Sequence, residues 1–104
     1  MEKYDVIIGA EAEKDLIGIL TYITETLKEP RTAARIFHSI REQILSLDHM
    51  PNRHAVIAEE PYATKGVRIF PVENYLAFYY VDDPARTVHV FRILYNRREW
   101  QNLI

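Results

Sequence analysis

Cysteine is absent from this chain of 104 residues, and glycine occurs only three times. The lack of cysteine excludes a disulfide framework, a thiolate zinc site and a cysteine nucleophile. Three glycines in separate contexts cannot form a phosphate-binding loop, and no run approaches the roughly 20 apolar residues of a membrane-spanning helix. The segment Met1–Asp5 also lacks the basic start of a signal peptide. We therefore expect one cytoplasmic domain over residues 1–104, without a membrane partner.

Charge of one sign does not dominate the chain either. Its net charge is −2 and 48% of its residues are hydrophobic, a balance typical of a globular protein. Four arginines between residues 86 and 104 stand against Glu99 alone, so a surface for nucleic acid would lie near this end. The four histidines show no metal-ligand spacing, and we expect neither a metal nor a cofactor.

Hydrophobic periodicity predicts two helices in the first half of the chain. One runs from Ala10 to just before Pro30, and the other from near Pro30 to about Asp48. Their apolar stripes are formed by Leu16, Leu20, Ile23 and Leu27, and by Ala33, Phe37, Ile40, Ile44 and Leu47, the second one widened by Ile36. Because only a few residues join them, the helices should pack as an antiparallel hairpin.

The remaining segments read as strands separated by turns. They comprise an N-terminal strand over residues 4–8 and three later strands over residues 67–72, 75–81 and 88–94. Residues 52–66 form a polar loop, which has room for a short strand near Val56. The order predicts an α+β domain in which the hairpin covers one face of a three- to four-stranded antiparallel sheet. The second face has no predicted cover, so some aromatic side chains should be exposed there.

Four segments in this order resemble the RelE/ParE superfamily, the toxins of bacterial type II toxin–antitoxin modules. They are Ala12-Glu13-Lys14-Asp15-Leu16 with the residues that follow, the Ile44-to-Pro51 stretch, Gly66-Val67-Arg68 with residues 74–79, and the run from Val88 to Arg98. The resemblance covers essentially the whole chain. It implies a cognate antitoxin as partner, with a disordered segment that wraps the toxin.

The family contains two activities. RelE-like members cut mRNA on the ribosome, and ParE-like members inhibit DNA gyrase. Attack of a 2′-hydroxyl on a phosphate requires cations and an acid or base, and in a nuclease of this family the candidate catalytic residues here would be Arg68, Arg92, Tyr95, Arg97 and Arg98. Strand alternation places Arg92 and Tyr95 on opposite faces unless a bulge intervenes.

One position departs from the nuclease pattern. RelE-like nucleases usually carry an arginine directly after the position of Tyr75, and this chain has Leu76. The terminal Tyr or His of nucleases is replaced by Glu99-Trp100-Gln101. The resemblance therefore favours a ParE-like toxin that acts on gyrase. A ribosome-dependent mRNA endonuclease and a non-catalytic antitoxin-binding protein remain as alternatives.

The candidate residues for target or antitoxin binding are Tyr75, Tyr79, Arg97, Arg98 and Trp100. Each has a structural alternative as well: Trp100 is either an interface anchor or a side chain packed against the sheet edge. His54 follows Arg53 in the polar loop, and it is either a catalytic base or an ordinary loop residue.

Overall fold

A computed structural model describes residues 3–96 and Trp100. The chain forms strand β1 (Asp5–Ile8), helix α1 (Ala10–Thr21) with a π-helical turn (Tyr22–Thr26), helix α2 (Pro30–Leu45), and strands β2 (Arg68–Val72), β3 (Tyr75–Asp82) and β4 (Thr87–Tyr95). Short 3₁₀ turns at Ser46–Asp48 and Pro51–Arg53 follow α2. The predicted order of strand, helical hairpin and sheet is confirmed.

The four strands form one twisted sheet in the order β1-β4-β3-β2. β4 pairs antiparallel with β3, and β3 with β2, as the short turns between them require. β1 instead runs parallel to β4; the chain between them comprises the helical hairpin, the loop after α2, β2 and β3, a connection long enough for parallel pairing. The sheet is thus mixed, whereas the sequence predicted an antiparallel one.

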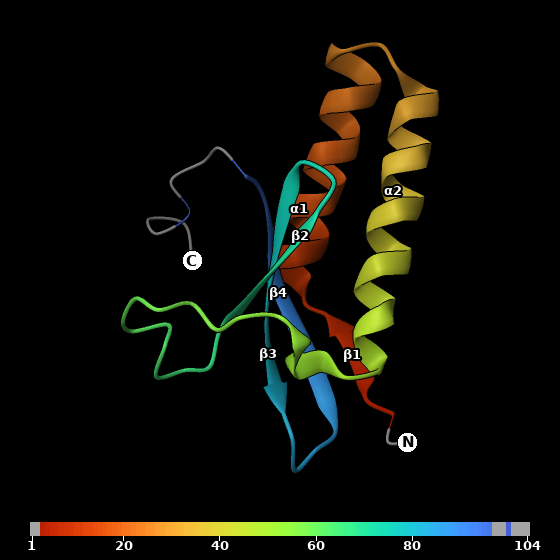
Figure 1. Ribbon diagram of the computed structural model, residues 1–104. Coiled ribbons are helices and arrows are strands. Elements are labelled where there is room, and N and C mark those ends of the chain that lie inside the picture. Colours follow the sequence, from red (N-terminus) through yellow and green to blue (C-terminus); the bar gives the residue numbers. More distant parts are fainter. Residues whose placement is uncertain (1–2, 97–99, 101–104) are drawn as a thin grey trace.

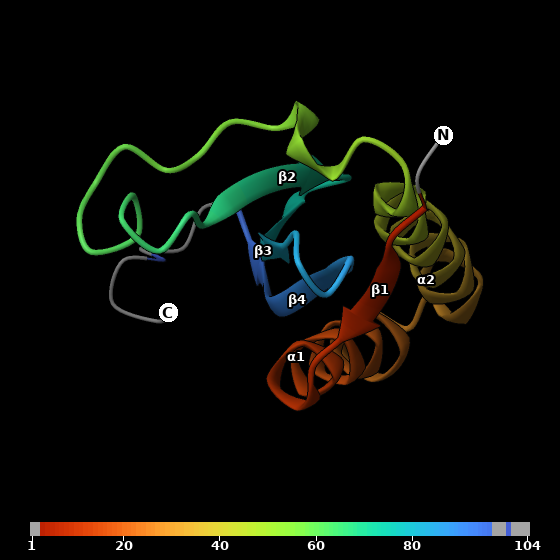
Figure 2. The same cartoon turned by 90° about the horizontal axis from the view of Figure 1, so that it is seen from below.

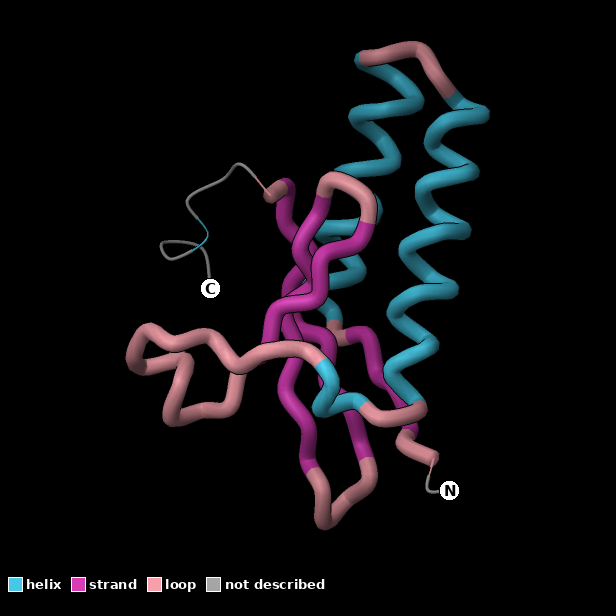
Figure 3. Tube along the Cα trace, viewed as in Figure 1, coloured by secondary structure: helices cyan, strands magenta, loops and turns pink. Residues whose placement is uncertain are grey.

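The two helices cover one face of the sheet, and the long loop that follows α2 lies on the other side (Figures 1 and 2). The hairpin also extends well beyond the end of the sheet (Figure 3). Its main stripes are buried as predicted, but Leu27 and Phe37 are exposed. Ile36 takes the buried position beside Phe37. The spacing of apolar residues predicts which side of a helix is apolar, but it does not predict where along the helix the sheet stops covering that side.

The second face of the sheet has a cover that the sequence did not predict. Residues 55–67 fold back over it, and Trp100 packs there as well. Together they bury a small cluster that consists of Ile57, Val67, Phe78 and Leu94. Beyond this cover, Tyr80 stacks on His89 with ring centroids 4.8 Å apart. Among the described residues, the exposed aromatic side chain on this face, Tyr80, therefore lies beyond the cover.

A bulge interrupts the alternation of β4. Phe78 of β3 pairs with Arg92 and its neighbour Tyr79 pairs with Val90, so Phe91 is an extra residue on β4. Val90 and Ile93 consequently both belong to the core beneath the helices. The alternation expected for this strand therefore changes phase at Phe91. From Arg92 to Tyr95 the register with β3 is regular, so these two residues occupy opposite faces of the strand, as expected.

The tight turn between β2 and β3 is stabilised by α2. Glu73 lies in this turn with a positive φ of 55°. Its carboxylate accepts hydrogen bonds from Ser39 Oγ at 2.8 Å and from Arg35 Nη1 at 3.2 Å. These hydrogen bonds, that of Ser39 foremost, lower the pKa of Glu73. The strained turn is thereby fixed against the helix.

Candidate functional site

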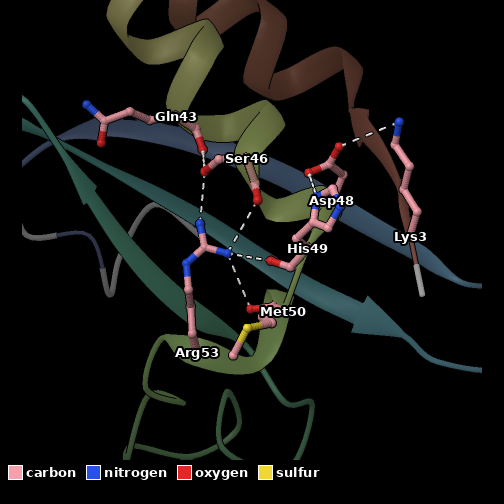
Figure 4. A network of polar contacts seen from close by, with 7 residues as sticks. All are labelled: Lys3, Gln43, Ser46, Asp48, His49, Met50 and Arg53. Carbon is pink, nitrogen blue, oxygen red and sulfur yellow. Dashed lines mark hydrogen bonds and ion pairs between the residues drawn. The ribbon is translucent and has the colours of Figure 1, made fainter. Parts of the chain in front are cut away.

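The charged part of the candidate site begins where α2 ends. We call residues 46–54 the Arg53 turn, because one guanidinium holds this segment together (Figure 4). Arg53 Nη1 donates to the carbonyl oxygen of His49 at 2.6 Å and to that of Met50 at 3.3 Å, and Nη2 donates to Ser46 Oγ at 2.8 Å. Met50 has the left-handed conformation, with φ 47°, so these bonds stabilise a backbone that a non-glycine residue rarely adopts.

Arg68 holds the other side of the same turn. From the start of β2 its Nη1 donates to the carbonyl oxygens of Asn52, at 3.2 Å, and of His54. The His54 ring stacks on Phe70 with centroids 4.1 Å apart. Burial, and then the charges of Arg53 and Arg68, lower the pKa of His54. At neutral pH the site therefore contains a neutral imidazole between two permanent cations.

Tyr79 closes the core beneath this turn. Its side chain is fully buried, and its hydroxyl donates to the carbonyl oxygen of Pro51 at 2.6 Å. Burial raises the pKa of Tyr79. The prediction that Tyr79 contacts a target or an antitoxin is therefore not compatible with its position, which is structural.

Arg92 is engaged in a different place, which we call the Asp15–Arg92 clasp. Its Nε and Nη2 donate to the two carboxylate oxygens of Asp15 on α1, at 2.7 and 3.0 Å. The same carboxylate accepts the backbone N–H of Ile93 at 3.0 Å. The Asp15 hydrogen bond raises the pKa of Arg92. The clasp joins α1 to β4 directly after the bulge, so Arg68 and Arg92 serve separate elements and are not brought into one catalytic cluster.

Tyr75 and Tyr95 come together across the ends of β3 and β4. Their rings meet edge to face with centroids 5.8 Å apart, and burial raises the pKa of Tyr75. They form one wall of a groove of about 850 Å³ between the sheet and the extended helical hairpin, which we call the helix-side groove. Tyr22, Leu27 and Lys14 lie on its opposite side.

The C-terminal candidates have different outcomes. Arg97 and Arg98 lie outside the described residues. Trp100 packs on Phe78 and Tyr62, with centroids 5.4 and 5.7 Å away. Of the two roles considered for Trp100, the structure shows packing within the protein, and the side chain lies on the face of the sheet rather than at its edge.

Three contributors to these sites were missed by sequence reasoning. Asp15 was noted only within a segment that resembles the family, but its partner lies 77 residues away. Arg53 acts on main-chain oxygens, which leave no pattern in a sequence. Tyr22 is exposed, whereas its neighbour Ile23 is buried. The sequence could have indicated this, because Tyr22 does not belong to the apolar stripe that contains Ile23. Within the described part of the chain, no three His, Asp or Glu residues are grouped to hold a metal, and no helix has the length and apolarity to span a bilayer.

The fold and grooves define a small α+β protein in which a helical hairpin leans on a four-stranded sheet, as in the toxins of type II toxin–antitoxin systems. The family model described as the ParE toxin of the type II toxin–antitoxin system parDE matches residues 6–100. The chain therefore belongs to the ParE toxin family, within the RelE/ParE superfamily.

Two solved structures share this fold. One is a chain of the chromosomal ParDE toxin–antitoxin system from P. aeruginosa, with a TM-score of 0.72 and 24% identity over 89% of this chain and 96% of that one. The other is a chain of the RelBE2 toxin–antitoxin complex from Mycobacterium tuberculosis, with a TM-score of 0.64 and 22% identity over 91% and 93% of the two chains. No curated protein matches the chain by sequence.

Proposed function

We propose that this toxin arrests bacterial growth by inhibiting DNA gyrase in the cytoplasm, and that a cognate antitoxin neutralises it. The observation that carries the proposal is that the two arginines on strands β2 and β4 are already bound to other groups of the protein. Arg92 is paired with Asp15, and Arg68 donates to main-chain oxygens of the Arg53 turn. Metal-independent RNA cleavage requires cations that converge on one phosphate, and these two guanidiniums serve different parts of the fold.

Leu76 adds a second argument. It packs with the cluster on the loop-covered face, opposite Leu94 of β4. A leucine at this position offers no charge to a phosphate, so the strand lacks the arginine that RelE-like nucleases carry there. This supports a toxin that works by binding to its target rather than by chemistry of its own.

The helix-side groove supports the antitoxin as partner. Its walls combine aliphatic side chains with Tyr22, Tyr75 and Tyr95, a composition suited to an amphipathic segment that folds as it binds. Tyrosine supplies a large contact area with little loss of conformational freedom. We place Tyr75 in this contact, and assign Arg97 and Arg98 to target or antitoxin binding from the charge of the C-terminal segment.

Ribosome-dependent mRNA cleavage is the second candidate, and the cluster of Arg53, His54 and Arg68 is the observation that favours it. A neutral imidazole near two cations is a combination suited to proton transfer beside a phosphate. Against this, His54 Nε2 is buried, so a substrate would have to displace the turn to reach it. The third candidate, a non-catalytic antitoxin-binding protein, predicts normal growth when the chain is expressed alone.

The test compares three readouts within minutes of inducing the chain without any antitoxin. Growth arrest with intact mRNA by primer extension, and with loss of supercoiling by purified gyrase in the presence of the chain, is the expected result. New translation-dependent cuts inside codons would instead establish the nuclease. Uninhibited growth at a verified protein level would leave only the non-catalytic binding protein.

Substitutions in the basic C-terminal segment test whether it contributes to target binding. The double substitution Arg97→Ala/Arg98→Ala should relieve growth arrest, because it removes two of the cations that we assign to target binding. Arg31→Ala/Lys65→Ala is the matched control, since it removes the same charge from exposed positions elsewhere on the fold. Full toxicity of the first variant would remove Arg97 and Arg98 from the site.

A further inference from the structure

The helical hairpin is divided by charge. Residues 10–26, which form α1 and its π-helical turn, carry four acidic residues against one lysine, a net charge of −3. α2 carries three arginines against one glutamate, a net charge of +2. The two helices lie side by side, so the hairpin presents an acidic edge and a basic edge in parallel.

A second, smaller groove runs between these two edges. Its floor is apolar and consists of Ile8, Leu16, Ile40 and Ile44, and its rims carry Glu13 with Ile17 on α1 and Phe37 with Arg41 on α2. We call this the hairpin groove. Ile17 is 63% exposed and Phe37 39% exposed, and both adjoin the apolar floor. Contiguous exposed apolar surface of this kind marks interaction sites.

The rim charges have no partner within the described chain. Neighbouring polar side chains are paired along their own helices: Glu11 with Lys14 at 3.7 Å, and His38 with Glu42 at 3.4 Å. Among the described residues, the side chains of Glu13 and Arg41 make no hydrogen bond or ion pair. Both line the same groove from opposite sides.

The order of the rim residues is self-complementary. Ile17 follows Glu13 by four residues on α1, and Arg41 follows Phe37 by four residues on α2, so each pair lies on one side of its helix. Because the helices are antiparallel, Glu13 on α1 lies across the groove from Arg41 on α2. One helical turn further along, Ile17 lies across the groove from Phe37. A two-fold axis along the groove would therefore set each acid against a base and each aliphatic side chain against an aromatic one.

We propose that the rims of the hairpin groove pack against those of a second copy of this chain in an isologous dimer. α1 of one protomer then lies over α2 of its partner, with Glu13 of each copy facing Arg41 of the other. The alternative two-fold axis, across the helices, would place acidic α1 on acidic α1, so the charges select the first arrangement.

The available surface predicts a weak dimer. A helix of 16 residues is about 24 Å long and about 10 Å wide, so the hairpin offers about 500 Å² for each protomer. The total of about 1,000 Å² lies at the lower limit for specific association. We expect a dissociation constant in the micromolar range that rises with salt, because exposed rim charges contribute to the contact.

Sedimentation equilibrium of the full chain, made by cell-free synthesis, tests the proposal. The wild-type chain should dimerise, and Glu13→Arg and Arg41→Glu should each weaken the dimer about tenfold. The exchanged pair Glu13→Arg/Arg41→Glu should restore it, whereas Glu42→Arg, a change on α2 outside the groove, should have no effect. A monomer at all concentrations, no recovery in the exchanged pair, or an equal loss from Glu42→Arg would overturn the proposal.

Cross-linking provides a second measurement that tolerates a weak dimer. Because the chain contains no cysteine, Glu13→Cys and Arg41→Cys each introduce a single thiol. An oxidised mixture of the two variants should give the mixed disulfide in preference to either homodimer, because each residue faces the other type across the axis. Dominant homodimers, or no cross-link, would contradict this arrangement, and circular dichroism confirms that each variant is folded.

Discussion

The two faces of the sheet differ in what covers them. Beneath α1 and α2, the core of described residues contains fifteen buried side chains drawn from both helices and from β2, β3 and β4. Beneath residues 55–67, the second core contains four. A core enclosed by rigid helices loses more stability when a side chain is truncated than a core covered by an irregular loop, because the loop can move to fill the space. Stability should therefore reside on the helix-covered face, and adaptability on the loop-covered face.

Matched isoleucines on the two faces give the largest expected effect. Ile44→Ala on α2 should lower the free energy of unfolding by about 4 kcal/mol, because the surrounding helices and strands cannot close the cavity. Ile57→Ala removes the same atoms beneath the loop and should cost about 2 kcal/mol or less, since the loop can settle inward. Denaturant unfolding measures both. Equal losses would mean that the two faces are equally rigid.

The Asp15–Arg92 clasp should have the next largest effect. Asp15→Asn removes the charge that Arg92 faces and weakens the bond to the Ile93 N–H, so we expect a loss of about 2–3 kcal/mol. Glu11→Gln on the same helix breaks an exposed ion pair with Lys14 and should change stability by less than about 0.5 kcal/mol. If both variants unfold at the same denaturant concentration, the clasp does not stabilise the join between α1 and β4.

The clasp also explains which features the sequence could reveal. Both helices and all four strands follow from local periodicity and turn residues, which act within a few positions along the chain. The bulge at Phe91 adjoins an arginine paired with Asp15, 77 residues away, and no local pattern carries that information. The same holds for the loop cover over Phe78 and for the burial of Tyr79. Of the candidate site, Tyr75 and Tyr95 were named separately, for binding and for catalysis, and their contact across the sheet was not predicted. Arg53 was not named as a candidate.

Two consecutive tyrosines of β3 allow the two faces to be compared by the loss of a single hydroxyl group on each. Tyr79 points into the helix-covered core and donates to Pro51, whereas Tyr80 is exposed on the other face. Tyr79→Phe leaves the buried Pro51 carbonyl without this donor and should cost about 1 kcal/mol. Tyr80→Phe should be neutral within about 0.5 kcal/mol. A neutral Tyr79→Phe would show that another donor reaches the Pro51 carbonyl.

The pH dependence of stability gives the smallest expected effect and tests the Arg53 turn. Because the folded state lowers the pKa of His54 below its ordinary value of 6.5, the unfolded chain binds a proton there first, and stability should fall as the pH drops below about 6.5. Arg53, Arg68 and Tyr79 are the titratable groups that face the ring, and none of them offers a carboxylate to offset the new charge.

Glu73 should produce a separate step at lower pH. Its pKa is also lowered in the folded state, from an ordinary value of 4.5, so its stabilising contribution is present above that value and is lost as the pH falls below it. Thermal unfolding from pH 8 to pH 3 should therefore show two declines. His54→Gln should remove the upper decline and leave the lower one, whereas Glu73→Gln should reduce the lower decline, to which other paired carboxylates contribute, and leave the upper one. If the upper decline persists in His54→Gln, it arises from another histidine, and protonation of His54 does not affect the stability of the Arg53 turn.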